Sequence, residues 1–374
     1  MNKIFVSQPF LGKTETDSVN DALSKGEISG FKGDYIGKFE SGFSSYCDCP
    51  YGVSVSSGTA ALHLALAALG VKQNDEVLVS SLTNMATFFA VLYQGAIPVP
   101  IDIEADTLNM DTALLESKIT TRSRAILVVH LFGHPVDMDP VNEIAKKYNL
   151  AVVEDCAEAH GALYKGKKVG SLGNAGCFSF YANKIITTGE GGMVTTKDAA
   201  LAERMRSLKS LAFGDHQKFM HKDIGFNYRL TNLQAAMGCA QFRKIEQIIS
   251  KKRQIAMHYQ HRLQNIKEIR LPVEKPYARN VYWMYHIVLK NKNLEQRRAI
   301  MEYLQKKGVE TREGFIPYNL QDVFIERGLT NKEDCPIANS VAYNSFYLPS
   351  GPVLREEEID YVVDNLLDAI DAVN

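Results

Sequence analysis

The fold is decided by a stretch close to the N-terminus, GVSVSSGTAALHLALAAL, which occupies residues 52–69. Its first part, residues 52–56, alternates valine with small residues, as a β-strand does. Its second part, residues 59–69, carries an apolar stripe that includes Leu62 and Leu69, which predicts a helix. A strand that leads directly into a helix is the repeating unit of an α/β domain with a largely parallel sheet.

The same alternation continues to about residue 200. Strands are predicted at residues 76–80, 96–100, 125–129 and 150–154, and helices at residues 87–94 and 139–148. The runs at 125–129 and 150–154 are continuously apolar, which is typical of parallel strands buried on both faces.

A second region begins near Asn232. Apolar residues recur every three or four positions as far as Leu263, with a change of phase near Lys251 and Lys252, which predicts one long, kinked helix. A strand at 282–289 and helices at 294–307 and 357–373 complete a smaller α+β unit. We therefore expect two domains, a large α/β one at 1–245 and a small C-terminal one at 246–374.

The composition of the 374 residues is that of an ordinary globular protein, with 45% hydrophobic and 23% charged residues. A formal net charge of -1 gives no general attraction to nucleic acid or to an anionic membrane. No apolar run approaches the length of a membrane span or a signal peptide. We expect a soluble cytoplasmic protein with no nucleic-acid or membrane partner.

The six cysteines are scattered along the chain, and only Cys47 and Cys49 lie close together. One intervening residue is the wrong spacing for a zinc knuckle or a redox pair. We expect free thiols and no metal site.

Lys184 stands between a strand-like apolar run, residues 177–181, and the glycine-rich turn at 189–192. Glycines let a backbone approach a ligand closely. A lysine withdrawn from water has a lowered pKa and can attack an aldehyde. The alternative is an ordinary surface lysine at a strand end.

Two acids follow the strand at 150–154. Asp155 lies at its carboxyl end, where open α/β sheets place their ligands, and could pair with a pyridine nitrogen. Glu158 could hydrogen-bond a ring hydroxyl. The alternatives are a helix cap for Asp155 and a solvated helix carboxylate for Glu158.

An anion site is predicted where the helix at 59–69 begins, at Ser56, Ser57, Gly58 and Thr59, because helix N-termini bind phosphates. Ser179 is a further candidate donor. N-capping by serine is the alternative. An amine for an aldehyde, an acid for a ring nitrogen and a phosphate cradle are together the parts of a pyridoxal phosphate (PLP) site.

With these residues in view, the sequence resembles the sugar aminotransferases of the DegT/DnrJ/StrS type over essentially its whole length. The resemblance is carried by residues 39–40, 57–66, 130–134, 154–159, 179–193 and 225–232. It implies a type I PLP-dependent aminotransferase fold, with a large, mixed, mostly parallel sheet domain and a smaller C-terminal domain. It also implies a homodimer with shared active sites.

The resemblance implies a role for each site residue. Lys184 would hold PLP as a Schiff base, Asp155 would meet the pyridine nitrogen, and Glu158 the ring hydroxyl. The phosphate would be bound by Gly58, Thr59 and Ser179, together with Asn227 from the partner subunit.

Within the family, the stretch after Lys184 is typical of enzymes that aminate a sugar at C4, and the nearest in look are GDP-perosamine synthases. This predicts transfer of an amino group from glutamate to a nucleotide-linked 4-keto-6-deoxy sugar. Arg229 and Arg312 are candidates for gripping the donor carboxylate or the sugar diphosphate, since guanidinium matches both; surface ion pairs are the alternative.

Three other functions are compatible with parts of the pattern. They are amination at C3, a PLP-binding regulatory protein without turnover, and a nicotinamide-dependent oxidoreductase. The last is disfavoured because no Gly-x-Gly-x-x-Gly follows an early strand.

The chain departs from the family at three positions. Asn84 stands where an aromatic residue usually stacks on the cofactor ring, which leaves Phe88 or Phe89 as candidates for that role. Glu27 replaces a tryptophan near the substrate entrance. Asn319, a further candidate substrate residue, replaces a common histidine that would help to bind the diphosphate.

Overall fold

The computed structural model describes residues 3–214, 217, 219–221 and 223–373. Its centre is a seven-stranded sheet, and the strands run across it in the order β1-β9-β8-β5-β4-β2-β3. Strand β9 is antiparallel to both of its neighbours, and the other strands are parallel to one another. The prediction of a mixed, mostly parallel sheet is confirmed. The strands are β1 (Tyr51–Val55), β2 (Glu76–Ser80), β3 (Ile97–Ile101), β4 (Ser123–Val129), β5 (Ala151–Asp155), β8 (Ala175–Ser179) and β9 (Gly192–Thr196).

Helices follow the strands as the alternating sequence predicts, and their ends agree with the prediction to within one residue. They are α3 (Gly58–Ala68), α4 (Ala86–Tyr93) and α5 (Met138–Tyr148), with α6 (Ala199–Lys209) after β9. Helix α3 is almost wholly buried and packs on β1, β8 and β9. The packing of its apolar side chains against these strands therefore fixes the position of its N-terminus at the edge of the sheet.

The predicted long helix is two helices, α7 (Asn232–Phe242) and α8 (Ile245–Leu263). The chain breaks at Arg243 and Lys244, not near Lys252. The change of phase at Lys252 has another cause: this lysine is itself buried, and its ammonium donates to the Ser350 carbonyl oxygen at 2.7 Å. A lysine at a core position therefore looked like an interruption of the apolar stripe.

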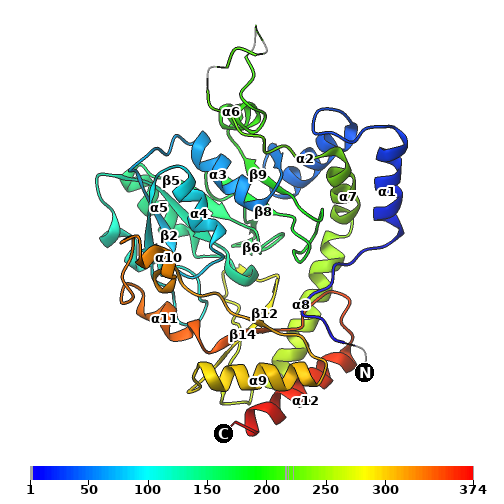
Figure 1. Cartoon of the computed structure of the whole chain (residues 1–374), viewed down its shortest axis with the longest axis vertical. Helices are drawn as coiled ribbons and strands as arrows, with labels where there is room; N and C mark the ends of the chain where they lie inside the picture. Colours follow the sequence, from blue (N-terminus) through cyan, green and yellow to red (C-terminus); the bar gives the residue numbers. More distant parts are fainter. Residues whose placement is uncertain (1–2, 215–216, 218, 222, 374) are drawn as a thin grey trace.

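Helix α7 packs against α1 (Lys13–Ser24) and α2 (Asp34–Tyr46) beside the large sheet. Helix α8 runs on from there to the opposite end of the molecule, where it meets α12 (Glu356–Asp371) (Figure 1). It thus connects the large sheet with the C-terminal part of the chain.

The C-terminal part is built on a four-stranded antiparallel sheet, β10-β12-β14-β13, with α9 (Leu294–Lys306) and α12 (Figure 1). Its strands are β10 (Ile269–Arg270), β12 (Tyr285–Leu289), β13 (Arg312–Glu313) and β14 (Ser345–Leu348). The strand predicted from Tyr282 begins at Tyr285, because Tyr282 has a positive φ of 49°. A separate apolar core forms here and includes Ile4 as well as residues beyond 245. The domain division at residue 245 stays a prediction.

Smaller elements connect these units. A three-stranded sheet joins β6 (Leu163–Tyr164), β7 (Lys167–Lys168) and β11 (Ala278–Arg279), and short helices α10 (Asp322–Ile325) and α11 (Pro336–Ala342) precede β14. Within the described residues, no helix has the length and apolar character needed to cross a bilayer. All six cysteines are free thiols, as expected.

Candidate active site

A cavity of about 430 Å³ lies at the carboxyl ends of the parallel strands. Strand β5 ends in it at Asp155, β8 ends in it at Ser179, and α3 begins in it. Segments of the C-terminal part close the other side. Eight of the predicted site residues line this one cavity: Ser57, Gly58, Thr59, Asp155, Glu158, Ser179, Lys184 and Arg312.

Lys184 lies in the loop that follows β8, with its side chain 12% exposed. Its Nζ is 3.9 Å from Glu158 Oε1 and 4.1 Å from the centroid of the Trp283 ring. Burial lowers the pKa of Lys184, and the carboxylates of Glu158 and Asp155 partly oppose this. A larger fraction of the amine is therefore neutral, and nucleophilic, than for an exposed lysine.

Asp155 is buried, and both of its carboxylate oxygens accept hydrogen bonds. The Thr87 hydroxyl donates to Oδ2 at 2.9 Å, and the Ala157 N–H donates to Oδ1 at 3.1 Å. Burial raises the pKa of Asp155, and these two donors partly offset the rise. A cation placed against this carboxylate would be strongly favoured, because the acid is held in place inside a dry site.

Glu158 is the second buried acid of the cavity. Its Oε2 accepts a hydrogen bond from the Phe132 N–H at 2.8 Å. Burial raises its pKa to about 7, while the nearby Lys184 pulls it down. Near neutral pH this carboxyl can therefore either accept or donate a hydrogen bond.

The N-terminus of α3 provides the anion site. Ser57 caps the helix, its hydroxyl accepting from the Ala60 N–H at 3.1 Å. The first N–H groups of a helix have no partner within it, so those of Gly58 and Thr59 can donate to a ligand in the cavity. Gly192 permits this arrangement, since a Cβ there would lie 2.3 Å from the Ser57 carbonyl oxygen.

These donors fit PLP. The cavity has an amine for its aldehyde, a buried carboxylate for its ring nitrogen and a helix N-terminus for its phosphate, each from a different element. The acid lies at the end of β5, between the lysine loop and α4. The chemistry and the placement of the three groups match the three polar parts of the cofactor.

Three predicted residues lie outside this cavity. Asn227 is exposed, and Arg229 lies over the ring of Phe31 at 4.5 Å. Asn319 is fully buried, and its amide donates to the Lys332 carbonyl oxygen at 2.7 Å and to Asn339 at 2.9 Å. Its side chain therefore packs in the interior and does not line the cavity.

The ring-stacking candidates also lie elsewhere. Phe88 is fully buried and stacks on Tyr318 at 4.1 Å between ring centroids, and Phe89 packs beside Phe324. Asn84 does line the cavity, with its Oδ1 accepting from the Ala86 N–H. Neither phenylalanine therefore takes the place of the missing aromatic residue.

Three further cavity residues escaped the sequence reasoning: Thr87, Trp283 and Tyr347. Thr87 reaches Asp155 from α4, and the other two come from segments about 100 residues or more beyond Lys184. Their sequence surroundings carry no motif, and only the tertiary fold brings them to the site.

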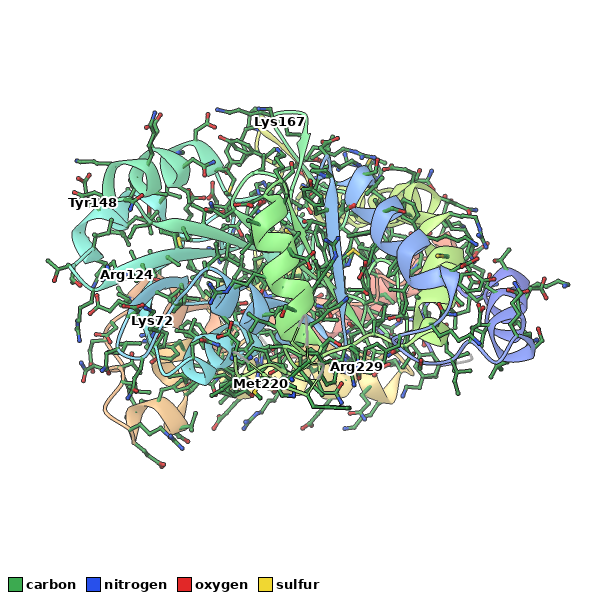
Figure 2. The ribbon with its side chains drawn as sticks, turned by 90° about the horizontal axis from the view of Figure 1, so that it is seen from above. Lys72, Arg124, Tyr148, Lys167, Met220 and Arg229 are labelled. Atoms are coloured by element: carbon green, nitrogen blue, oxygen red, sulfur yellow. The ribbon has the colours of Figure 1, made fainter. Side chains whose placement is uncertain are left out.

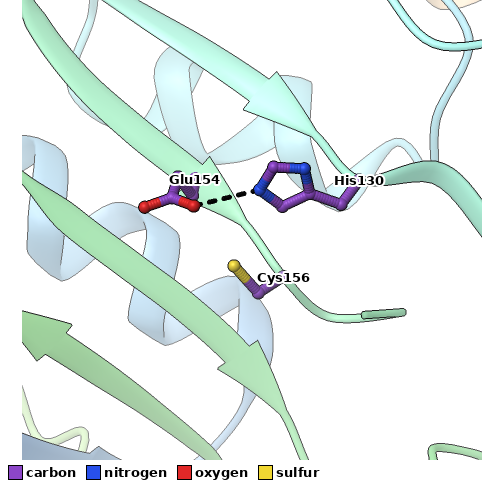
Figure 3. A group of neighbouring side chains, drawn as sticks. All are labelled: His130, Glu154 and Cys156. Carbon is purple, nitrogen blue, oxygen red and sulfur yellow. Dashed lines mark hydrogen bonds and ion pairs between the residues drawn. The ribbon is translucent and has the colours of Figure 1, made fainter. Parts of the chain in front are cut away.

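A buried cluster of His130, Glu154 and Cys156 lies beside the cavity, with ligand atoms close enough to suggest a metal (Figure 3). The hydrogen bonds of these residues indicate a structural role for the cluster. Nδ1 of His130 accepts from the Val136 N–H, so Nε2 carries the proton and donates to Glu154 at 3.1 Å. Glu154 also accepts three backbone N–H groups, from Gly170, Leu172 and Gly173. The cluster thus holds the 170–173 loop against β5.

Comparison with known proteins agrees with this geometry. Residues 9–367 match the DegT/DnrJ/EryC1/StrS aminotransferase family. The chain is 40% identical, over 98% of each sequence, to GDP-perosamine synthase of Escherichia coli O157:H7. It is 38% identical, over 89% of each, to dTDP-3-amino-3,6-dideoxy-alpha-D-galactopyranose transaminase of Aneurinibacillus thermoaerophilus.

Among solved structures, the PLP form of the putative sugar aminotransferase Spr1654 from Streptococcus pneumoniae superposes with a TM-score of 0.94 at 27% identity, over 100% of both chains. The predicted type I fold and the PLP cofactor are confirmed. The chain is a PLP-dependent transaminase and belongs to the DegT/DnrJ/EryC1/StrS aminotransferase family.

Proposed function

We propose that this enzyme moves an amino group from glutamate to the C4 ketone of a nucleotide-linked 4-keto-6-deoxyhexose, as in the synthesis of a GDP-linked 4-amino sugar. The observation that carries the proposal is the partly desolvated Lys184 amine facing two buried acids in a cavity that opens beside Arg312. The 40% identity to a GDP-perosamine synthase supports the choice of sugar. The product would serve in surface polysaccharide synthesis.

Each residue has a defined task in this proposal. When bound, PLP supplies an electron sink for the carbon that carries the nitrogen. Lys184 would hold its aldehyde and, when free, would move a proton to and from the substrate carbon as general base and acid. Asp155 keeps the ring nitrogen protonated, and Glu158 bonds the ring hydroxyl.

The phosphate is bound by Ser57, Gly58, Thr59 and Ser179 at the start of α3 in this proposal. The helix dipole and the free N–H groups favour an anion there. These residues would hold the phosphate end of the cofactor, and Lys184, which lines the same cavity, would hold its aldehyde end.

Arg312 lines the cavity and is exposed, which suits a grip on the sugar diphosphate or on the donor carboxylate. Arg229 lies outside the cavity in this protomer, beside Asn227. We propose that Arg229 and Asn227 act across the interface of a homodimer, in which Asn227 of one subunit reaches the phosphate in its partner's cavity. The exposed position of Asn227 supports this assignment. A cytoplasmic location remains a prediction.

Amination at C3 is the second candidate, because a relative named for a 3-amino sugar is 38% identical to this chain. The sequence after Lys184 favours C4. Both reactions would use the same cofactor-binding residues and would differ in the orientation of the hexose in the cavity.

The deciding experiment supplies the purified enzyme with glutamate and, separately, with GDP-, UDP- and dTDP-linked 4-keto and 3-keto sugars, and identifies each product by NMR. An amine at C4 of the GDP-linked sugar is the expected result. An amine at C3 would contradict the C4 assignment. If glutamate changes the absorbance of the bound cofactor but no amino sugar forms from any of these ketones, the result would indicate a regulatory protein instead.

A further inference from the structure

Trp283 contacts the site lysine in two ways. Its indole N–H donates to the Asn183 carbonyl oxygen at 2.8 Å, and the face of its ring lies 4.1 Å from Lys184 Nζ. Asn183 and Lys184 are neighbours in the chain, so one side chain holds both the backbone and the amine of the lysine loop.

Trp283 is itself firmly held. It is 4% exposed, and its backbone N–H donates to the Phe132 carbonyl oxygen at 2.9 Å. The neighbouring Phe132 also donates its N–H to Glu158, the carboxylate nearest to the lysine. The tryptophan belongs to the segment that leads into β12, so it links the C-terminal sheet to the lysine loop of the large sheet.

We infer that Trp283 is a positioning residue for Lys184, which fixes the lysine loop through the Asn183 carbonyl and holds the free ammonium on its ring face. Aromatic faces attract ammonium groups, and indole does so most strongly. The inference rests on the proposed role of Lys184 as the amine that is released and takes up a proton during turnover.

Other groups also face the lysine, and they set the background for its titration. They are the carboxylates of Asp155 and Glu158, the neutral His160, and Arg312, Glu313 and Glu190 on the cavity wall. Burial holds the pKa of His160 at about 3, so it stays uncharged while Lys184 titrates.

Trp283 is the only tryptophan of the chain, which makes the contact directly observable. In the cofactor-free protein, its fluorescence is expected to change with pH as Lys184 gains or loses its proton, with a midpoint below that of free lysine. The Lys184→Met variant is expected to lose this transition. A fluorescence titration that is identical in the variant would overturn the inference.

Competitive acetylation read by mass spectrometry then measures the pKa of Lys184 itself in the cofactor-free protein. In Trp283→Phe, which keeps a weaker aromatic face and leaves only a small gap, that pKa is expected to fall by about half a unit to one unit. An unchanged or higher value would overturn the inference.

Phe315→Leu is the matched control, because Phe315 lines the same cavity but packs against Phe132 and Tyr347. The Lys184 pKa in this variant is expected to match the wild type, and an equal fall would overturn the inference. These measurements need neither glutamate nor a keto sugar. Failure of the inference is therefore distinct from failure of the proposed function, which the product analysis tests.

Discussion

The surroundings of Lys184 act in opposite directions on the protonation of its amine. Burial in the cavity disfavours its charged form, whereas Glu158, Asp155 and the ring of Trp283 favour it. The result is an amine whose pKa lies below that of an exposed lysine. Lys252 is a useful contrast, since it is more deeply buried but donates to a backbone carbonyl and lies outside the cavity.

The first prediction separates these two buried lysines. Borohydride reduction of the PLP-loaded protein is expected to fix the cofactor on the wild type and on Lys252→Met, but not on Lys184→Ala. Transamination by Lys184→Ala is expected to fall by about 10²–10⁴-fold, the usual contribution of a general acid–base group, or further. Intact-mass measurement reads the adduct. A full adduct with full activity in Lys184→Ala would refute the assignment.

The second prediction uses the pKa of Glu158, which burial raises from 4.5 to about 7. The folded protein holds a proton here that the unfolded chain has released, so the contribution of this carboxyl to stability is present below about pH 4.5 and is lost as the pH rises through 7. Glu158→Gln carries no such charge. Relative to wild type, the cofactor-free variant should gain up to about 3 kcal/mol between pH 5 and pH 8.

Urea unfolding at the two pH values measures this difference. Glu154→Gln is the control, because its carboxylate accepts three backbone N–H groups and its replacement should destabilise the protein at both pH values. If Glu158→Gln changes the free energy of unfolding equally at pH 5 and pH 8, burial does not raise the pKa of Glu158.

At the scale of elements, the site is made by the ends of strands and the start of a helix. The third prediction concerns Gly58 at the first position of α3, where a Cβ would lie 2.7 Å from Ser179 Cβ. Gly58→Ala is expected to push the helix N-terminus away from Ser179. Overpacking of this kind costs about 1–3 kcal/mol, so the Kd for PLP should rise about tenfold or more.

Gly37→Ala is the matched control. Gly37 lies within α2, and a Cβ there would meet nothing within 4 Å. The substitution should leave PLP binding unchanged and stabilise the helix slightly. Titration of the cofactor absorbance gives both dissociation constants, and equal values in the two variants would argue against a tightly fitted cradle.

The sequence predicts such elements well where hydrophobic burial alone decides them. Strands β2, β4 and β5 are buried on both faces, and their apolar runs marked them to within two residues. The break between α7 and α8 was missed because a buried lysine, Lys252, looks polar in the sequence and apolar in its position. A single hydrogen bond to Ser350, remote in the chain, makes the difference.

For the site, Asp155 and Ser179 could be found because each stands at the end of a recognisable strand. Thr87 and Trp283 could not, since their roles depend on contacts with segments 68 and 100 residues away. Asn319 stands where the family commonly has a histidine, yet its own hydrogen bonds direct it into the interior. Placement of this kind is set by tertiary packing, which a motif does not encode.

At the scale of the whole molecule, two strongly exposed apolar side chains lie in or against the predicted partner-facing loop. Phe31 is 66% exposed and Ile224 90% exposed, and Phe31 lies under the guanidinium of Arg229. Met220 and Arg229 lie toward the same edge in the view from above (Figure 2). Contiguous exposed apolar patches mark interfaces, so a contact surface at this loop is open to test.

The last prediction tests whether this surface joins two subunits. Ile224→Glu places a charge on this surface, so the proposed homodimer should dissociate, because burying an unpaired carboxylate is strongly unfavourable. PLP should then bind more weakly although Ile224 lies outside the cavity, since Asn227 of the partner subunit would no longer reach the phosphate. Light scattering gives the mass of the particle, and absorbance titration gives the Kd. Met257→Glu, at a 58% exposed position on α8, should change neither value. A wild-type protein that is monomeric and binds PLP as tightly as Ile224→Glu would show that each cavity is complete within one chain.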